Sequence, residues 1–397
     1  MAPDNDLEVG KQATIEINPE ILKWTIESSG WEIDDLARRL KVKPDTIQQW
    51  YKESKIEISK LEQLAENVKR PLGVFFLPKP PVEHELTDYR KLGGIKSEKL
   101  SRKTLSAIRE SRYLQSIAKE LMLDQKMNVM PEISKVTLND DPETIAFRER
   151  EKLGFHSDDG LLSKEVKGER EFYNKLREKI ESFNIFVFQI NMPVEEARGF
   201  TLSDVYPVTI IVNSSDLIKP RIFTLLHEYG HILIKRDGIC LPESHLATNN
   251  NKNDLQKIER WCNTFAASLL MPKAEFLDEV AELENTPYTP KRILTLLSNK
   301  FKASQTAVVV RMKNLTPNRD YLQFYDEALE EIEKKEISTS KKKKGGPSPV
   351  NKCIGQKGRK FISLVLDSKE KQTVDYNEMI DYLDISVKQL GKLQEKI

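Results

Sequence analysis

FTLLHEYGHILI, residues 223–234, places two of the chain's five histidines four positions apart, with a glutamate directly after the first. The residues around them are largely apolar, as in a buried helix, and Pro220 suits the first turn of that helix. Residues four apart on a helix differ by about 40° in azimuth, so His227 and His231 project side by side. We therefore expect a buried helix that presents both imidazoles on one face.

Two neighbouring imidazoles can bind one metal ion, and Zn²⁺ commonly occupies such sites. Glu228 follows the first histidine, where its carboxylate can reach a metal-bound water without being a ligand, as in H-E-x-x-H metalloproteases. The alternative is an ordinary buried helix whose histidines are satisfied by hydrogen bonds. Because a chance H-E-x-x-H is uncommon with so few histidines, we expect a zinc site with Glu228 as general base.

The loop after the motif offers several candidates for a third protein ligand. Asp237 stands where an extended motif places its last ligand, but Ile234 replaces the glycine at which such a motif turns. Cys240 and His245 lie further along the loop, and no rule of spacing favours them.

Glu259 is better placed than the loop residues. It lies in IERWCNTFAASLLMP, within a second expected helix from about residue 254 to residue 270. Two histidines and one glutamate would leave the fourth zinc position to water, as in thermolysin-type sites. Asn263, one turn after Glu259, is placed to accept a hydrogen bond from a ligand histidine and fix its tautomer.

These stretches resemble the ImmA/IrrE family of zinc metallopeptidases, whose pattern runs FTLAHELGH and then E-x-x-A-N-x-F-A-x-x-L-L-M-P. The resemblance covers residues 165–275 and includes RGFTL and VTIIVN ahead of the motif. Cys262 stands where alanine is commoner in the family, and a small buried thiol can fill that space. Carried over by position, the resemblance implies the zinc ligands His227, His231 and Glu259 and the general base Glu228.

The resemblance also implies a function: a cytoplasmic, bacterial or phage, zinc-dependent endopeptidase. Its protein substrate would be a transcriptional repressor or another regulatory protein in a stress or mobile-element response. The alternative is a DNA-binding transcriptional regulator or antitoxin-like protein with a structural or sensory metal site. A fourth protein ligand, for example Cys240 or His245, would mark that alternative.

The N-terminal part, residues 1–80, is expected to form an all-α, Xre-type helix-turn-helix domain. Apolar residues recur at helical spacing between residues 19 and 70, and the proline-rich FLPKPPVEH then stops the pattern. LARRLKVKPDTIQQW resembles the bihelical unit of lambda-repressor-type domains. If this unit binds DNA, the residues expected to face the major groove are Thr46, Gln48, Gln49 and Lys52.

DNA binding and protein contact both stay open for this domain. Asp45, Glu53 and Glu57 would lie close to the phosphates whose charge a DNA-binding surface must neutralise. The whole chain carries 63 basic and 62 acidic residues, so no overall field attracts it to nucleic acid or to a membrane.

The remaining sequence indicates an α+β multidomain protein without membrane spans. Its three cysteines are odd in number and far apart, which fits a reducing, cytoplasmic compartment better than a disulfide framework. IFVFQI and YPVTIIVN, with their β-branched and aromatic residues, are typical of strands in a small sheet. The expected segments after the N-terminal domain are a helical connector (81–160), a zincin-like metallopeptidase domain (161–275), a helical extension (276–336), a flexible linker (337–352) and a small helical C-terminal module (353–397).

Overall fold

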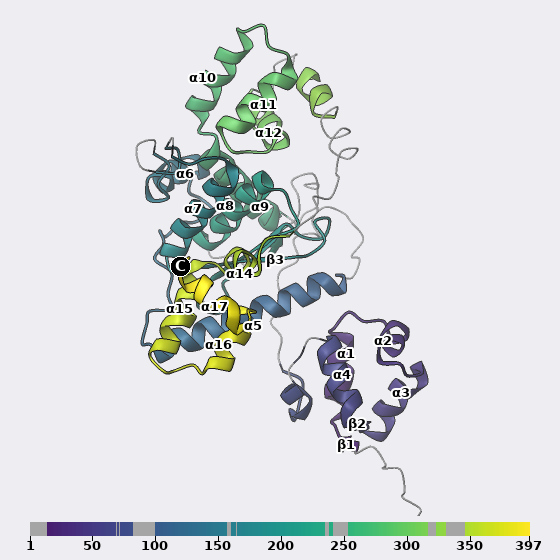
Figure 1. Ribbon diagram of the computed structural model, residues 1–397. Helices are drawn as coiled ribbons and strands as arrows, with labels where there is room; N and C mark the ends of the chain where they lie inside the picture. Colours follow the sequence, from purple (N-terminus) through teal and green to yellow (C-terminus); the bar gives the residue numbers. More distant parts are fainter. Residues whose placement is uncertain are drawn as a thin grey trace, which may run out of the picture. The chain divides into compact units, whose positions relative to one another are not determined.

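The computed structural model describes residues 14–68, 70, 72–81, 100–156, 160–163, 165–234, 238–240, 253–316, 323–330 and 346–397. These ranges contain many helices and two small sheets, which is consistent with the expected α+β class (Figure 1). None of the described helices has the length and apolar character needed to cross a membrane. The described residues fall into two compact units, residues 14–81 with 100–109 and residues 110–397.

The first unit is a small helical bundle, but it is not all-α as expected, because two three-residue strands form an antiparallel ribbon beside the helices. Prolines open two of its helices, in first turns where the missing N–H has no helical partner. The expected bihelical unit corresponds to its second and third helices, and its Xre-type classification stays a prediction. The elements are β1 (Thr14–Glu16), α1 (Pro19–Glu27), α2 (Ile33–Leu40), α3 (Pro44–Glu53), β2 (Lys55–Glu57), α4 (Ile58–Val68) and the 3-10 helix η1 (Leu72–Phe76), followed by the first turns of α5 (Arg102–Asp124).

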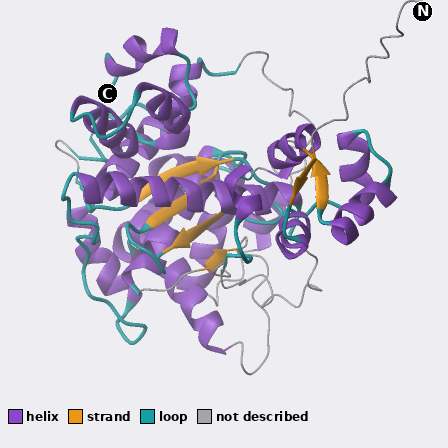
Figure 2. Cartoon of the chain, turned by 90° about the horizontal axis from the view of Figure 1, so that it is seen from below, coloured by secondary structure: helices purple, strands orange, loops and turns teal. Residues whose placement is uncertain are grey.

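The second unit is built on a mixed four-stranded sheet, seen in Figure 2 with helices around it. Its strands are β3 (Phe186–Ile190), β4 (Gly199–Leu202), β5 (Thr209–Asn213) and β6 (Gly238–Cys240), in the order β3-β5-β4-β6. β3 is parallel to β5, whereas β4 is antiparallel to both β5 and β6. Every residue of β3, β4 and β5 is buried, so both faces of the sheet are covered by other elements.

One face of this sheet carries the helices that hold the histidine motif. α8 (Ile218–Leu233) packs on β4 and β5, with α7 (Glu169–Ser182) and α9 (Asn253–Leu270) on its flanks. β4 comes very close to α8 because Gly199 has no side chain: a Cβ there would lie 2.6 Å from Cγ2 of Thr224. This close approach lets β4 contribute side chains beside the motif.

α6 (Pro142–Lys152) lies within the stretch expected to be a helical connector, and it packs along α9. Its Glu149 accepts a hydrogen bond from the hydroxyl of Tyr229 on α8 at 2.6 Å, in a buried setting. α6 is thus joined to both helices of the motif region. The core continues through α10 (Lys273–Glu284), α11 (Pro290–Lys300) and α12 (Gln305–Leu315).

The C-terminal helices cover the other face of the sheet. Side chains alternate along β3, so Val187 joins the core beneath α8 whereas Phe186 and Phe188 face away from it. Phe361 packs edge-on against both phenylalanines, with ring centroids 6.3 and 5.3 Å apart. It belongs to a module of α14 (Pro349–Lys357), α15 (Arg359–Glu370), α16 (Tyr376–Leu383) and α17 (Val387–Gln394).

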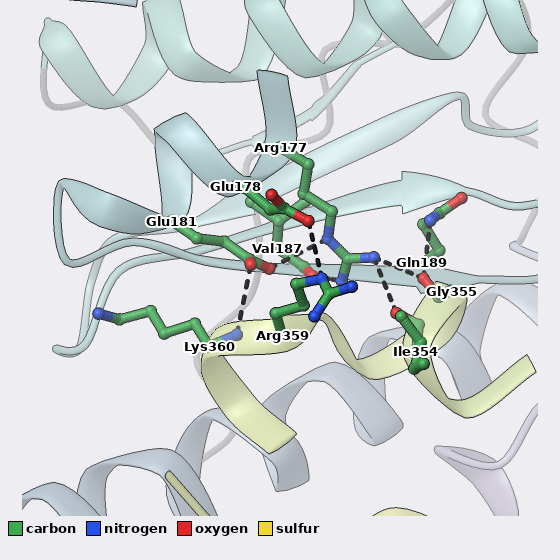
Figure 3. Close-up of polar contacts among 9 residues, drawn as sticks. All are labelled: Arg177, Glu178, Glu181, Val187, Gln189, Ile354, Gly355, Arg359 and Lys360. Atoms are coloured by element: carbon green, nitrogen blue, oxygen red, sulfur yellow. Dashed lines mark hydrogen bonds and ion pairs between the residues drawn. The ribbon is translucent and has the colours of Figure 1, made fainter. Parts of the chain in front are cut away.

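A buried ion pair anchors this module at the edge of the sheet (Figure 3). Arg177 on α7 pairs with Glu181 at 3.0 Å, and both side chains are about 5% exposed. Arg177 also donates to the carbonyl oxygens of Val187 on β3 and Gly355 on α14. The guanidinium therefore satisfies carbonyls of the edge strand and of the helix that covers it.

The expected domain boundaries stay predictions. α14 begins inside the stretch expected to be a linker, and residues 337–345 of that stretch lie outside the described residues.

Candidate metal centre

The two histidines of the motif face each other on buried turns of α8. His227 is 5% exposed and His231 is fully buried. Their Nε2 atoms lie 3.1 Å apart, and the rings meet at an interplanar angle of 66°. Helical spacing thus produces the expected pair of imidazoles, with both Nε2 atoms directed at one point.

Glu259 on α9 completes this group. Its Oε1 lies 3.1 Å from Nε2 of His231, and its Oε2 lies 3.4 Å from Nε2 of His227. Three ligands of a tetrahedral zinc ion, each about 2.05 Å from the metal, lie about 3.3 Å from one another. The observed distances therefore fit one small ion bound by three protein ligands. Among the described residues, the metal-binding side chains whose ligand atoms all lie within 4.8 Å of one another form this group of three.

The charges of the group suit a cation. Burial alone raises the pKa of Glu259, but the two neighbouring histidines outweigh it and hold that pKa well below its usual range. Glu259 is therefore ionised at neutral pH and can act as an anionic ligand.

Glu228 is fully buried beside the group but outside it. One carboxylate oxygen, Oε2, accepts a hydrogen bond from Oγ1 of Thr201 on β4 at 2.8 Å. The other, Oε1, has no hydrogen-bond partner among the described residues. A buried carboxylate oxygen without a donor is costly, and a bound water molecule would supply one. The donor set and this unsatisfied oxygen both fit an H-E-x-x-H zinc site.

Burial also raises the pKa of Glu228, against the opposing effect of His231 and His227. A carboxylate with a raised pKa binds a proton more readily than an exposed one. This property is the one that a general base needs at near-neutral pH.

Some of the residues that we expected at this site from the sequence lie outside the described part of the structure. Asp237 and His245 lie outside the described residues, and only the backbone of Cys240, in β6, is described. Asn263 is half-buried on α9, and its contact with a ligand histidine stays a prediction.

Cys262 fills space between the two helices of the site. Its Sγ would lie 3.4 Å from a Cβ added at Gly230, so the thiol lies directly against α8. Burial raises the pKa of this thiol well above its usual range, and the charges of Glu259 and Glu228 raise it further. It is therefore a neutral packing group, as expected from the sequence.

Thr201 was not anticipated from the sequence. It belongs to RGFTL, the strand segment ahead of the motif, two positions after Gly199. Alternation along a strand places both residues on the face toward α8, which is the signal that could have identified it.

The residues expected to face DNA all lie on α3 in the first unit. Gln48, Gln49 and Lys52 are exposed, and Thr46 is half-buried. Gln49 donates a hydrogen bond to Glu53 at 2.7 Å, so the acidic residue lies directly beside one of the expected contacts. DNA contact by these residues stays a prediction.

A buried H-E-x-x-H helix beside a small sheet, with a carboxylate from a second helix, is the arrangement of a metalloprotease. Comparison with known proteins leads to the same class. Residues 180–313, which contain α8 and α9, match the Peptidase_M78 family, the IrrE N-terminal-like domain. The radiation response metalloprotease IrrE of Deinococcus radiodurans is 30% identical over 108 residues, which are 27% of this chain and 31% of that protein. Both findings support the ImmA/IrrE family.

Proposed function

We propose that this protein is a zinc-dependent endopeptidase whose ligands are His227, His231 and Glu259 and whose general base is Glu228. The observation that carries the proposal is the convergence of three ligand atoms beside a buried glutamate that is not part of the ligand group. The family match of residues 180–313 supports metalloprotease activity independently of that geometry.

The site residues divide the chemistry among them. When bound, zinc polarises the peptide carbonyl and lowers the pKa of a water toward about 7. Glu228 accepts the proton of the attacking water on Oε1 and returns it to the leaving amine. Thr201 holds Oε2 through its hydroxyl and leaves Oε1 without a protein donor among the described residues, so that Oε1 is available to accept the proton.

The proposed substrate is a transcriptional repressor or another regulatory protein in a stress or mobile-element response, cleaved in the cytoplasm. The support for this part is the family resemblance of the two motif stretches. The matched region spans 31% of the relative's length, so that protein's radiation response is not transferred to this chain.

The alternative is a DNA-binding regulator in which the metal is structural or sensory. Such a site requires a fourth protein ligand and no open position. The described residues supply three converging ligands, and the side chains of the two candidates for a fourth, Cys240 and His245, lie outside them. A coordination count by X-ray absorption spectroscopy on the zinc-loaded protein would distinguish three protein ligands plus water from four protein ligands.

Substitutions should separate metal binding from hydrolysis. His227→Ala, His231→Ala and Glu259→Ala should each lose zinc together with activity. Glu228→Gln should keep about one zinc per chain yet lose hydrolysis, because an amide cannot accept the proton of the attacking water. Asn263→Ala should lower zinc affinity or activity by about 10- to 100-fold if it orients a ligand histidine.

Zinc analysis of these variants, paired with a cleavage assay on candidate repressors, tests the assignment. Full zinc occupancy in Glu259→Ala would show that the third ligand is wrong. Wild-type hydrolysis by Glu228→Gln would remove the proposed base.

A further inference from the structure

The first unit contains a cavity of about 560 Å³ that is lined by residues of that unit. Four of its lining side chains are cationic, Arg39, Arg102, Lys103 and Arg109, and one, Glu66, is acidic. The whole chain has only one positive charge in excess, so this concentration of cations is local.

The cations come from separate elements that meet at the cavity. Arg39 lies near the end of α2, and the other three lie on the first turns of α5. Among the described residues, no carboxylate forms an ion pair with Arg39, Arg102 or Lys103. Like charges that share a half-enclosed space repel one another, and a bound anion would relieve that repulsion.

Neutral contacts hold several of these side chains in place. Arg39 donates from Nε to the side-chain oxygen of Asn67 at 3.0 Å, and Arg109 donates to the carbonyl oxygen of Ser28 at 3.1 Å. The guanidinium of Arg102 lies over the indole of Trp31, 3.8 Å from its ring centroid. Cations that are already oriented lose less conformational entropy when a ligand binds.

We propose that this cavity binds a phosphorylated small molecule of about the size of a mononucleotide. Arginine and lysine side chains at several angles suit the oxygens of a phosphate group. The stacked pair of Arg102 and Trp31 offers a planar surface for an aromatic base. The cavity volume lies within the range of small-molecule sites, about 300–1,000 Å³.

Duplex DNA is the less suitable occupant. The residues expected to face the major groove lie on α3, and no residue of α3 lines the cavity. Nor does the cavity include any residue of the metal centre, which belongs to the second unit.

The test uses the full-length protein and isothermal titration calorimetry with pyrophosphate and AMP as separate probes at low salt. The pocket variant is Arg39→Gln with Lys103→Gln. The matched control is Arg38→Gln with Lys119→Gln. It also removes one arginine from α2 and one lysine from α5, but at exposed positions that do not line the cavity. Titration in a His227→Ala background reports whether phosphate binds at the metal centre instead.

We expect at least one probe to bind at one site per chain. The pocket variant should weaken that binding by about tenfold or more, whereas the control and His227→Ala should leave it unchanged. AMP binding tighter than pyrophosphate would assign a role to the planar surface, and the reverse order would assign the site to phosphate alone.

Several results would overturn the proposal. The first is that neither probe binds at millimolar concentration. The second is that the pocket variant and the control lose affinity for the probe equally, and the third is that His227→Ala loses that affinity. If the pocket variant lost binding to duplex DNA but not to either probe, the cavity would be a DNA contact and the proposal would be wrong. Melting temperatures check that all variants fold, and Lys103→Gln alone replaces the pair if the double variant does not.

Discussion

Replacing Thr201 with valine should impair hydrolysis without removing the metal. The substitution nearly preserves side-chain volume but deletes the hydroxyl that donates to Oε2 of Glu228 at 2.8 Å. Glu228 is fully buried, and its Oε1 already has no donor among the described residues. The valine variant would therefore leave both carboxylate oxygens without a donor among the described residues.

The size of the effect follows from the kind of hydrogen bond that is lost. A buried hydrogen bond to a charged group contributes about 1.5–3 kcal/mol. If that contribution positions Glu228 in the transition state, its loss lowers kcat/KM by about 10- to 150-fold, because each 1.36 kcal/mol is a factor of ten. Zinc content should stay near one per chain, since Thr201 is not among the converging ligands.

The assay is steady-state cleavage of a protein substrate with zinc measured on the same samples. Thr201→Ser is the matched control, because it keeps the hydroxyl and deletes only a methyl group. We expect the serine variant to recover most of the activity that valine loses. Valine at the wild-type rate, or serine as impaired as valine, would refute a positioning role for the hydroxyl, and loss of zinc from the valine variant would indicate a structural role.

Three further predictions concern stability and reactivity. Arg177→Met should lower the free energy of unfolding by about 3–5 kcal/mol in urea titrations, because Glu181 would stay buried without its partner. Adding Glu181→Leu should recover part of this loss, and the remainder reports the hydrogen bonds that the carbonyl oxygens of Val187 and Gly355 no longer receive from Arg177. Asp141→Ala should cost about 1 kcal/mol, because Asp141 caps α6. Hydrogen bonds from the side chain and backbone of Thr144 lower the pKa of Asp141. The stabilisation by this cap should therefore be fully present above pH 3.8, the ordinary pKa of the group, and should disappear as the pH falls through the lower pKa of the folded state. The Asp141→Ala variant should lack this part of the pH dependence of unfolding. Burial raises the pKa of Cys353 to about 11, so its thiol should be alkylated slowly at pH 8. The rate of alkylation, measured by mass spectrometry, should rise about tenfold per pH unit below that pKa. Fast labelling at pH 8 would contradict the burial of this thiol.

The arrangement of the candidate metal centre could be predicted from the sequence where it depends on residues close together in the chain. The relation between His227 and His231 depends only on helical spacing. Glu259 lies on another helix, and its selection depended on the family resemblance as well as on periodicity. Thr201 reaches Glu228 from 27 residues away through the packing of β4 on α8; alternation gives the face of the strand, but not the helix that covers it.

In the fold, too, local elements could be predicted from the sequence, whereas contacts between distant segments could not. Helical periodicity marked out the region of α8 and α9, and β-branched and aromatic runs marked β3 and β5. The charged sequence around α6 gave no sign that the helix packs along α9, because only a few of its residues, such as Ile145 and Ala146, are buried. Partners of this kind are chosen by tertiary packing, which local sequence does not encode.

Because α14 and α15 dock on β3, one face of the sheet stays uncovered during translation until these C-terminal helices have been synthesised. Gln189 and its partner Gly355 are 166 positions apart, and at 5–20 residues per second a ribosome needs roughly 8–33 s to cover that interval. α8 and α9 both emerge within it, so His227, His231 and Glu259 can come together before Phe361 is available to pack on Phe186 and Phe188. A nascent chain in that interval exposes an aromatic sheet face of the kind that chaperones bind, and a stop codon ahead of α14 would make that exposure permanent.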